Sequence, residues 1–327
     1  MHAERSDYRR ACGRYPLGGS CSPGKAVSAN GAGGEFSPRK RVGTSGACGD
    51  SAMAPVLKIV PEDWAEALSV CRARRPLIYA VTNYIAASFQ ANAILAVGAS
   101  PVMSPCIHEA EELARSAEGV LINTGAPSED RELLIRNALT AAEVKRSATL
   151  LDPVGYGAAS FRRQLVDALL RDFRFAVVKG NRGEISLLAG EKGDVKGVDS
   201  EGSYASIVRS VRTVAVKTRS LVCATGETDV LSDGDAVLSV RGGSALLGRI
   251  TGGGCVLGAL MLTLSTAASS ISAGVVCASV LLRLAAERAE KISNGPGTFQ
   301  AHLLDALHKT HPEELLNEAW RVEEVTE

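Results

Sequence analysis

A run of three glycines followed by a cysteine, residues 252–255, opens an apolar segment with helical periodicity. Consecutive glycines let backbone N–H groups converge on an anion, and the N-terminal end of the following helix adds positive charge. The pattern can hold a phosphoryl group during transfer, although a turn of this kind taken alone is more often structural. The helix end should also lower the pKa of the Cys255 thiol, so that this side chain can take a proton.

Two carboxylates follow predicted strands. Asp152, followed by Pro153, ends one strand, and Glu184 lies three residues after Asn181 at the start of a predicted helix. Asn and Glu at this spacing share one face, so Glu184 can reach a metal or its water shell while Asn181 orients a phosphate. The same pair would serve equally well as a helix cap, and Asp152 alone would more often form a turn.

Short apolar runs alternate with helical periodicity from Met53 onward, which predicts a mostly parallel sheet covered by helices on both faces. Ligands of such sheets bind beyond the carboxyl ends of the strands. Five separate segments that follow predicted strands should therefore form one cluster: Thr82–Asn83, Asn123–Gly125, Asp152–Pro153, Lys179–Asn181 and Thr225–Gly226.

The periodicities predict the elements that carry this cluster. Strands are expected at residues 76–82, 119–122, 149–151, 175–178 and 221–224, and helices at 87–97, 129–146, 161–170 and 203–219. A hairpin over 229–240 should turn at Asp233–Gly234, and the chain should be helical from Cys255 almost to its end. The uncharged stretch 250–282 is divided by Ser and Thr into two shorter apolar segments, which suit core helices better than a membrane span.

The first 52 residues differ in composition from the rest. They contain ten glycines, few aliphatic residues, and eight basic against four acidic side chains. Such a segment is predicted to be a disordered leader, and residues 53–327 to be the folded domain. We expect a cytoplasmic protein, with organellar targeting by residues 1–52 as an alternative.

Composition excludes several classes of function. Lys plus Arg and Asp plus Glu both number 36, so no excess charge favours nucleic acid or an anionic membrane as a partner. The eight cysteines contain no C-x-x-C pair and are expected to be reduced. The five histidines lie outside the predicted cluster, which argues against a histidine metal site and a Ser/His/Asp hydrolase: His2, His108, His302, His308 and His311.

Several motifs in order resemble those of the hydroxyethylthiazole kinase family over about residues 65–308. They are Pro76–Leu77 with Thr82–Asn83, Ala99–Met103, Leu151–Gly155, Lys179–Glu184, Thr225–Glu227, Thr251–Cys255 and Gly295–Phe299.

The resemblance implies a ribokinase-like three-layer α/β/α sandwich and a homotrimer with thiazole sites at the subunit interfaces. It also implies phosphorylation of 4-methyl-5-(2-hydroxyethyl)thiazole by ATP with Mg²⁺. Cys255 matches the position at which most ribokinase-like enzymes carry an aspartate base. With the patterns above, the predicted site comprises substrate contacts Asn83, Met103 and Gly252, nucleotide contacts Lys179, Asn181 and Thr225, and the metal-organising carboxylates Glu184 and Asp152.

Two positions depart from the family pattern. Lys179 stands where the family usually has Arg, which leaves nucleotide preference open because Lys offers a point charge instead of a fork. Tyr79 stands where it usually has His, which leaves substrate range open. The alternatives are a kinase for a pyrimidine alcohol, a ribokinase-like hydro-lyase that repairs hydrated nicotinamide nucleotides, and a silent small-ligand binding protein. The hydro-lyase predicts Asp at Cys255, and Glu184 together with Cys255 argues against a silent protein.

Overall fold

The computed structural model describes residues 57–191 and 204–326. The described residues belong to one compact unit of the chain, Ser51–Glu327. The predicted leader, residues 1–52, lies outside the described ranges, so its disorder, its targeting role and the domain boundary at Met53 stay predictions.

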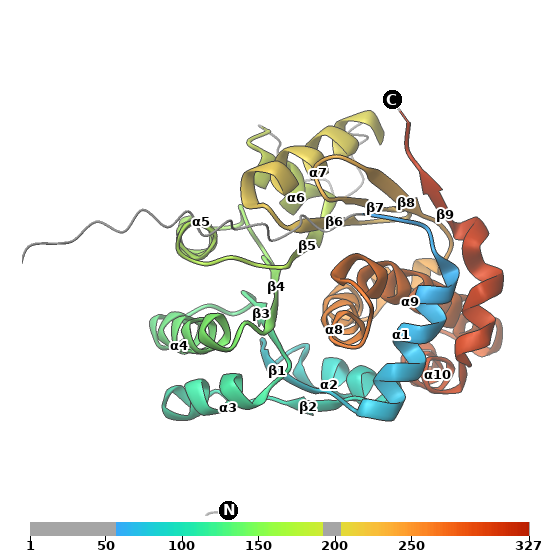
Figure 1. Cartoon of the computed structure of the whole chain (residues 1–327), viewed down its shortest axis with the longest axis horizontal. Coiled ribbons are helices and arrows are strands. Elements are labelled where there is room, and N and C mark those ends of the chain that lie inside the picture. The colour runs from blue at the N-terminus through green and yellow to red at the C-terminus, as the bar shows by residue number, and fades with distance from the viewer. Residues whose placement is uncertain (1–56, 192–203, 327) are drawn as a thin grey trace, which may run out of the picture. The chain divides into compact units, whose positions relative to one another are not determined.

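Nine strands among the described residues form one sheet in the order β2-β1-β3-β4-β5-β6-β7-β8-β9. The strands from β2 to β6 pair in parallel, whereas β7, β8 and β9 continue the sheet in antiparallel pairs. The sheet curves around helix α8 (Gly253–Ser265) (Figure 1). The strand bounds are β1 Leu77–Val81, β2 Ser100–Val102, β3 Gly119–Asn123, β4 Ala148–Asp152, β5 Val177–Asn181, β6 Leu221–Thr225, β7 Asp229–Ser232, β8 Val237–Val240 and β9 Val322–Glu324.

Helices cover both faces of the sheet, which confirms the predicted three-layer sandwich (Figure 1). The outer layer consists of α3 Ala110–Ser116, α4 Glu129–Lys145, α5 Ser160–Asp172, α6 Arg182–Ala189 and α7 Tyr204–Thr218. The inner layer consists of α8 with α1 Pro61–Arg74, α2 Ala87–Ala96, α9 Ile271–Ile292 and α10 Pro296–Lys309. Single turns or short runs of 3-10 helix connect them: η1 Ile107–Glu109, η2 Ala245–Arg249 and η3 Pro312–Arg321.

Each layer packs on the sheet through its own apolar core, because successive strand residues face opposite sides. In β1, Ile78 and Ala80 belong to the inner core, whereas Tyr79 and Val81 belong to the outer core. Every residue of β3 is buried, as expected for a parallel strand covered on both faces. Polar side chains on these strands therefore have room only at the strand ends.

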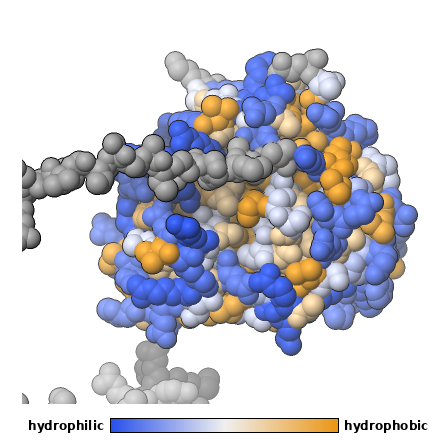
Figure 2. Space-filling view, viewed as in Figure 1, coloured by the Kyte–Doolittle hydropathy of each residue, from blue (hydrophilic) through white to orange (hydrophobic). Residues whose placement is uncertain are grey.

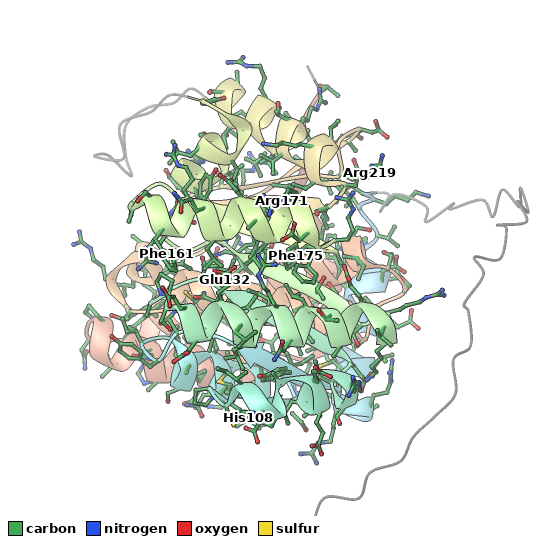
Figure 3. The ribbon with its side chains drawn as sticks, turned by 90° about the vertical axis from the view of Figure 1, so that its left-hand side faces the viewer. His108, Glu132, Phe161, Arg171, Phe175 and Arg219 are labelled. Carbon is green, nitrogen blue, oxygen red and sulfur yellow. The ribbon has the colours of Figure 1, made fainter. Side chains whose placement is uncertain are left out.

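The outer layer is joined by charged contacts at its surface. Figure 3 looks onto this layer and shows Glu132 on α4, Arg171 on α5 and His108 beside α3. Arg136 bridges Glu132 to Asp172 of α5, with N–O distances of 2.9 Å to each. His108 lies in η1, which precedes α3.

The elements predicted between residues 76 and 224 are confirmed, with ends shifted by up to three residues. The hairpin and the helices after Cys255 are confirmed as well. Helix α1 was not predicted, although Pro61 occupies its first turn and its buried side chains recur at helical spacing: Trp64, Ala67, Leu68 and Cys71.

The uncharged stretch 250–282 comprises the turn after η2, α8 and the first half of α9, and most of its apolar side chains lie in the inner core. Among the described helices, none has the length and apolarity to cross a bilayer. The face seen in Figure 2 is mostly hydrophilic, with hydrophobic residues gathered in small separate patches.

Candidate active site

Asp152 ends β4 and is fully buried between charged and polar neighbours. Its Oδ1 lies 3.3 Å from the Lys179 ammonium, and its Oδ2 accepts a 2.9 Å hydrogen bond from Asn123 Nδ2. The Cys255 thiol lies beside this carboxyl. Burial raises the pKa of Asp152, whereas the Lys179 charge, the hydrogen bonds from Lys179 and Asn123, and the neighbouring thiol oppose that rise. The network joins the carboxyl-terminal parts of β3, β4 and β5 to the first turn of α8.

Two asparagines connect this carboxylate to the segment after β1. Asn123 ends β3, and its Oδ1 accepts a 2.8 Å hydrogen bond from Asn83 Nδ2. Asn83 Oδ1 in turn accepts hydrogen bonds from the amides of Ile85 and Ala86, 3.1 and 3.0 Å away. Asn83 is 5% exposed, so its side chain fixes the β1–α2 turn while its predicted substrate contact stays a prediction.

Cys255 lies in the first turn of α8, with its sulfur 3.3 Å from Asn123 Nδ2. Burial and the Asp152 charge raise the pKa of the thiol to about 11, although Lys179 opposes them. The prediction that the helix end lowers this pKa is therefore wrong, because the positive end of α8 does not compensate for burial beside a carboxylate. The thiol is protonated at neutral pH in this arrangement.

Lys179, predicted as a nucleotide contact, extends under the glycine turn and is 4% exposed. A Cβ added to Gly254 would lie 3.7 Å from its Nζ, and one added to Gly258 would lie 3.6 Å from its Cδ. Burial would lower the pKa of Lys179, but the negative charges nearby, that of Asp152 foremost, raise it above its ordinary value. The side chain therefore supplies a fixed positive charge directly below the turn.

Asn181 and Glu184 form a reciprocal capping box at the start of α6. Asn181 Oδ1 accepts from the Glu184 amide, and Glu184 Oε2 accepts from the Asn181 amide, both at 2.8 Å. Glu184 Oε1 accepts a further 2.8 Å bond from the amide of Gly155, in the loop after β4. Burial and Asp152 raise the pKa of Glu184. The capping interpretation is confirmed, and the same carboxylate lies at the ligand edge of the sheet.

The two predicted metal-organising carboxylates fit a hydrated ion better than direct chelation. Each oxygen of Asp152 and Glu184 already accepts a hydrogen bond or an ion pair. No group of three or more His, Cys, Asp or Glu side chains suited to metal binding exists among the described residues. Mg²⁺ in nucleotide sites keeps several waters and takes only one or two carboxylates besides phosphate oxygens, and this donor set is compatible with that pattern.

A pocket of about 820 Å³ opens beside the glycine turn. Gly253 and Gly254 of α8 and Thr225 at the end of β6 contribute to its walls. Thr225 Oγ1 donates a 3.3 Å hydrogen bond to the carbonyl of Gly180, which joins the ends of β5 and β6. The other walls come from the β6–β7 turn, the segment after β8, and α9: Gly226, Glu227, Thr228, Asp229, Arg241 to Ala245, Leu247, Gly248, Leu257, Ser279, Leu282 and Arg283.

The remaining predicted residues lie at the two sides of this centre. Gly252 is the N-cap of α8 with φ +83°, a left-handed conformation that favours glycine. A Cβ on Gly252 would meet Ala86 at 3.5 Å, so the turn borders the β1–α2 segment. Met103 follows β2 and packs against the inner core. No hydrogen bond among the described residues joins Met103 to the Asp152 cluster, and its substrate contact stays a prediction.

Sequence patterns missed several residues of the site. Gln90, in the middle of α2, donates a 2.8 Å hydrogen bond to the carbonyl of Cys255 and is fully buried. A buried Gln on an apolar helix face was the available signal. Arg283 on α9 lies in the wall of the pocket, and no local pattern in the sequence relates it to the loops that it contacts.

Comparisons with known proteins agree with this geometry. The model of the hydroxyethylthiazole kinase family matches residues 68–313. The chain belongs to this family. A hydroxyethylthiazole kinase of Listeria welshimeri is 39% identical over 236 residues, covering 72% of this chain and 88% of the relative. One from Nitratidesulfovibrio vulgaris is 38% identical over 245 residues, covering 75% and 91%.

Solved structures place the family member in its fold class. The hydroxyethylthiazole kinase protein of Pyrococcus horikoshii is 34% identical and has a TM-score of 0.73. The match covers 80% of this chain and 99% of that protein. A ribokinase-like superfamily protein of Enterococcus faecalis is 12% identical with a TM-score of 0.53, covering 71% of this chain and 86% of its own. The second comparison concerns the fold alone and confirms the predicted ribokinase-like class.

Proposed function

We propose that this hydroxyethylthiazole kinase family member transfers the γ-phosphoryl group of ATP to the hydroxyl of 4-methyl-5-(2-hydroxyethyl)thiazole, in thiamine salvage. One observation carries the proposal. The half-buried Cys255, beside the buried Asp152, belongs to the same helix terminus whose Gly253 and Gly254 line the large pocket. A nucleotide in that pocket would direct its terminal phosphate toward the thiol.

The first turn of α8 supplies the phosphoryl-binding groups. The amides of Gly254 and Cys255 have no carbonyl partner within the helix, because the first turn of any helix leaves its N–H groups unpaired. They point out of the N-terminus, where the helix adds positive charge. The Lys179 ammonium below the turn contributes a further positive charge. Donors held in this way can stabilise the charge of a phosphoryl group in transfer.

Cys255 is the group placed to receive the alcohol proton. Its thiol is protonated at neutral pH and lies beside the Asp152 carboxylate. As the alcohol proton moves to the sulfur, the thiol proton would move to that carboxylate, so no free thiolate is needed. Asn123 and Gln90 hold the thiol and the helix backbone in position, with bonds of 3.3 Å to the sulfur and 2.8 Å to the carbonyl.

Mg²⁺ bound with ATP would neutralise phosphate charge. Glu184 and Asp152 would face its water shell, whereas Asn181 and Thr225 lie at the strand ends that border the phosphates. The fixed backbone bonds of Glu184 would hold the carboxylate in place for that purpose.

A homotrimer with thiazole sites between subunits is part of the proposal. Tyr84 and Ile85 follow the buried Asn83 and are 80% and 58% exposed. Two large apolar side chains exposed next to the site favour coverage by another copy of the chain. Sedimentation equilibrium of the parent and of Tyr84→Asp tests this: the parent should be trimeric and the variant should dissociate. A monomeric parent with full activity would exclude the shared site.

A coupled ADP-release assay across thiazole, pyrimidine and sugar alcohols tests the reaction itself. We expect turnover to require ATP and Mg²⁺ and to be highest with hydroxyethylthiazole. Equal or faster turnover of a pyrimidine or sugar alcohol would contradict the substrate assignment. The parent should show no dehydration of hydrated nicotinamide nucleotides, since Cys255 stands at the position for which that chemistry predicts Asp.

A further inference from the structure

A single buried arginine on α9 holds both sides of the large pocket. Arg283 is 5% exposed and forms a bidentate ion pair with Asp229, the first residue of β7, with distances of 2.8 and 3.2 Å. Its Nη1 donates to the carbonyl of Glu227 at 2.8 Å, and its Nη2 donates to that of Gly226 at 3.0 Å. These bonds secure the β6–β7 turn.

The same guanidinium reaches the opposite wall. Its Nη1 also donates to the carbonyl of Gly242, in the segment after β8. The next residue, Gly243, donates its amide to Glu287 Oε1 at 2.8 Å, and Glu287 lies one helical turn after Arg283 on α9. Both pocket walls are therefore tied to one helix, where Arg283 and Glu287 add to the β7–β8 ladder that pairs Asp229 with Val240.

These bonds also set the direction of backbone donors. The described peptide bonds are trans, so each N–H points opposite to the preceding carbonyl. Because the carbonyls of Gly226 and Glu227 point to Arg283, the amides of Glu227 and Thr228 point away from it. Both residues line the pocket, and no turn or side-chain hydrogen bond among the described residues occupies either amide. Two N–H groups at the pocket wall suit a phosphate or ribose oxygen.

We propose that Arg283 is a positioning residue for nucleotide: it sets the separation of the pocket walls and directs the Glu227 and Thr228 amides toward the bound nucleotide. The inference rests on the proposed function, in which this pocket takes ATP. Asp229 accepts hydrogen bonds from the remaining guanidinium N–H groups of Arg283. It also accepts a 3.1 Å hydrogen bond from the amide of Gly226. Arg283 acts through the backbone and has no part in proton transfer.

The first test replaces Arg283 with Lys, which keeps a cation beside Asp229 but has three N–H donors instead of five, so it cannot serve three carbonyls and the carboxylate at once. The Kd of adenylyl imidodiphosphate with Mg²⁺, measured by calorimetry without thiazole, should rise about tenfold or more, as expected for losing several bonds that preorganise the site. In steady state, KM for ATP should rise similarly, while KM for the thiazole stays within about twofold and kcat at saturating ATP falls only slightly.

Arg288→Lys is the matched control. Arg288 lies on the same helix and pairs with Glu314 at 2.5 Å, but it does not line the pocket. Its substitution should leave the nucleotide Kd unchanged. A second variant, Arg283→Met with Asp229→Asn, removes both charges together and so avoids an unpaired buried carboxylate. It should lose at least as much nucleotide affinity as Arg283→Lys.

The outcomes separate positioning from simple stability. A lower melting temperature with an unchanged nucleotide Kd in Arg283→Lys would overturn the proposal. So would equal losses in Arg283→Lys and Arg288→Lys. If the parent binds the nucleotide but does not phosphorylate the thiazole, the proposed function fails, yet the comparison of Kd values still decides the role of Arg283.

Discussion

The reaction centre and the nucleotide pocket are built in different ways. In the proposed centre, side chains would do the chemistry directly: Lys179 pairs with Asp152, and Cys255 lies beside that carboxyl. In the pocket, backbone groups would face the nucleotide, and Arg283 bonds to the carbonyls behind them. The first region should fail by losing turnover, whereas the second should fail by losing nucleotide affinity. Substitutions in each region can therefore be distinguished by which kinetic constant they change.

The largest expected effect is that of Cys255→Ala. If the thiol accepts or relays the alcohol proton, kcat should fall by about 10²- to 10⁴-fold, the range for removing a general base. Binding of the thiazole should suffer much less, because the lost interaction belongs to the transition state. Steady-state kinetics and thiazole binding by calorimetry measure the two effects. Full turnover by Cys255→Ala would leave the glycine amides and Mg²⁺ to carry the reaction.

Two further variants at this position sharpen the test. Cys255→Ser should also lose kcat, because a hydroxyl gives up its proton to the neighbouring carboxylate far less readily than a thiol does. Cys255→Asp should equal or exceed the parent, since burial and Asp152 raise the pKa of any acid here but a carboxylate starts far below a thiol, and the pKa of the parent thiol is about 11. A Cys255→Asp enzyme as slow as Cys255→Ala would contradict a proton-accepting role.

The contrast between the regions also explains what the sequence could predict. Strand and helix periods give the parallel sheet, and its topology brings the strand-end residues Asn83, Asp152 and Lys179 to one edge. The sequence could not reveal whether each side chain faces ligand or protein. The sequence predicts that Lys179 contacts the nucleotide, whereas in the structure its Nζ pairs with Asp152 and lies under Gly254. That direction depends on the packing of α8, which the sequence does not show.

The pocket walls were not predictable for a different reason. Arg283 bonds to partners between 41 and 57 residues away in the chain, and an isolated Arg in an apolar helix has no local pattern that names them. The glycines after β8 were visible in the sequence, but their role depends on α9 packing against them. Helix α1 is a different case, because its buried side chains Trp64, Ala67, Leu68 and Cys71 recur at a helical spacing that the sequence itself displays.

Lys179→Met should have the next largest effect, and chiefly on stability. It would leave the Asp152 charge buried and unpaired, which costs about 3–5 kcal/mol. Urea denaturation should show this loss, and Asp152→Asn in the same chain should restore most of the stability but not the activity. Lys179→Arg should weaken activity as well, because the larger head group has little room under Gly254 and Gly258. Tighter nucleotide binding by Lys179→Arg would show instead that the side chain reaches the phosphates.

Gly242→Ala should produce a smaller effect, confined to the pocket. Gly242 has φ +97°, and an added Cβ would lie 2.6 Å from Glu287 Oε1 as well as against Arg321. Gly190→Ala is the matched control, since Gly190 has φ +93° with nothing within 4 Å of its Cβ position. Both variants carry the conformational cost of about 1 kcal/mol. Only Gly242→Ala should also raise KM for ATP, and equal KM values in the two would remove this turn from the nucleotide site.

Deleting residues 1–52 should have the smallest effect and should leave both regions unchanged. Every residue of the reaction centre and of the pocket comes from β1 or later, and the first 52 residues contain few aliphatic side chains that could join a core. The truncated chain should match the parent in melting temperature, in kcat and in KM for ATP. A fall in kcat alone would connect the segment with the reaction centre, and a rise in KM for ATP alone would connect it with the pocket. A fall in kcat and a rise in KM for ATP, together with a lower melting temperature, would mean that the segment packs on the domain. That result would contradict the prediction from its composition.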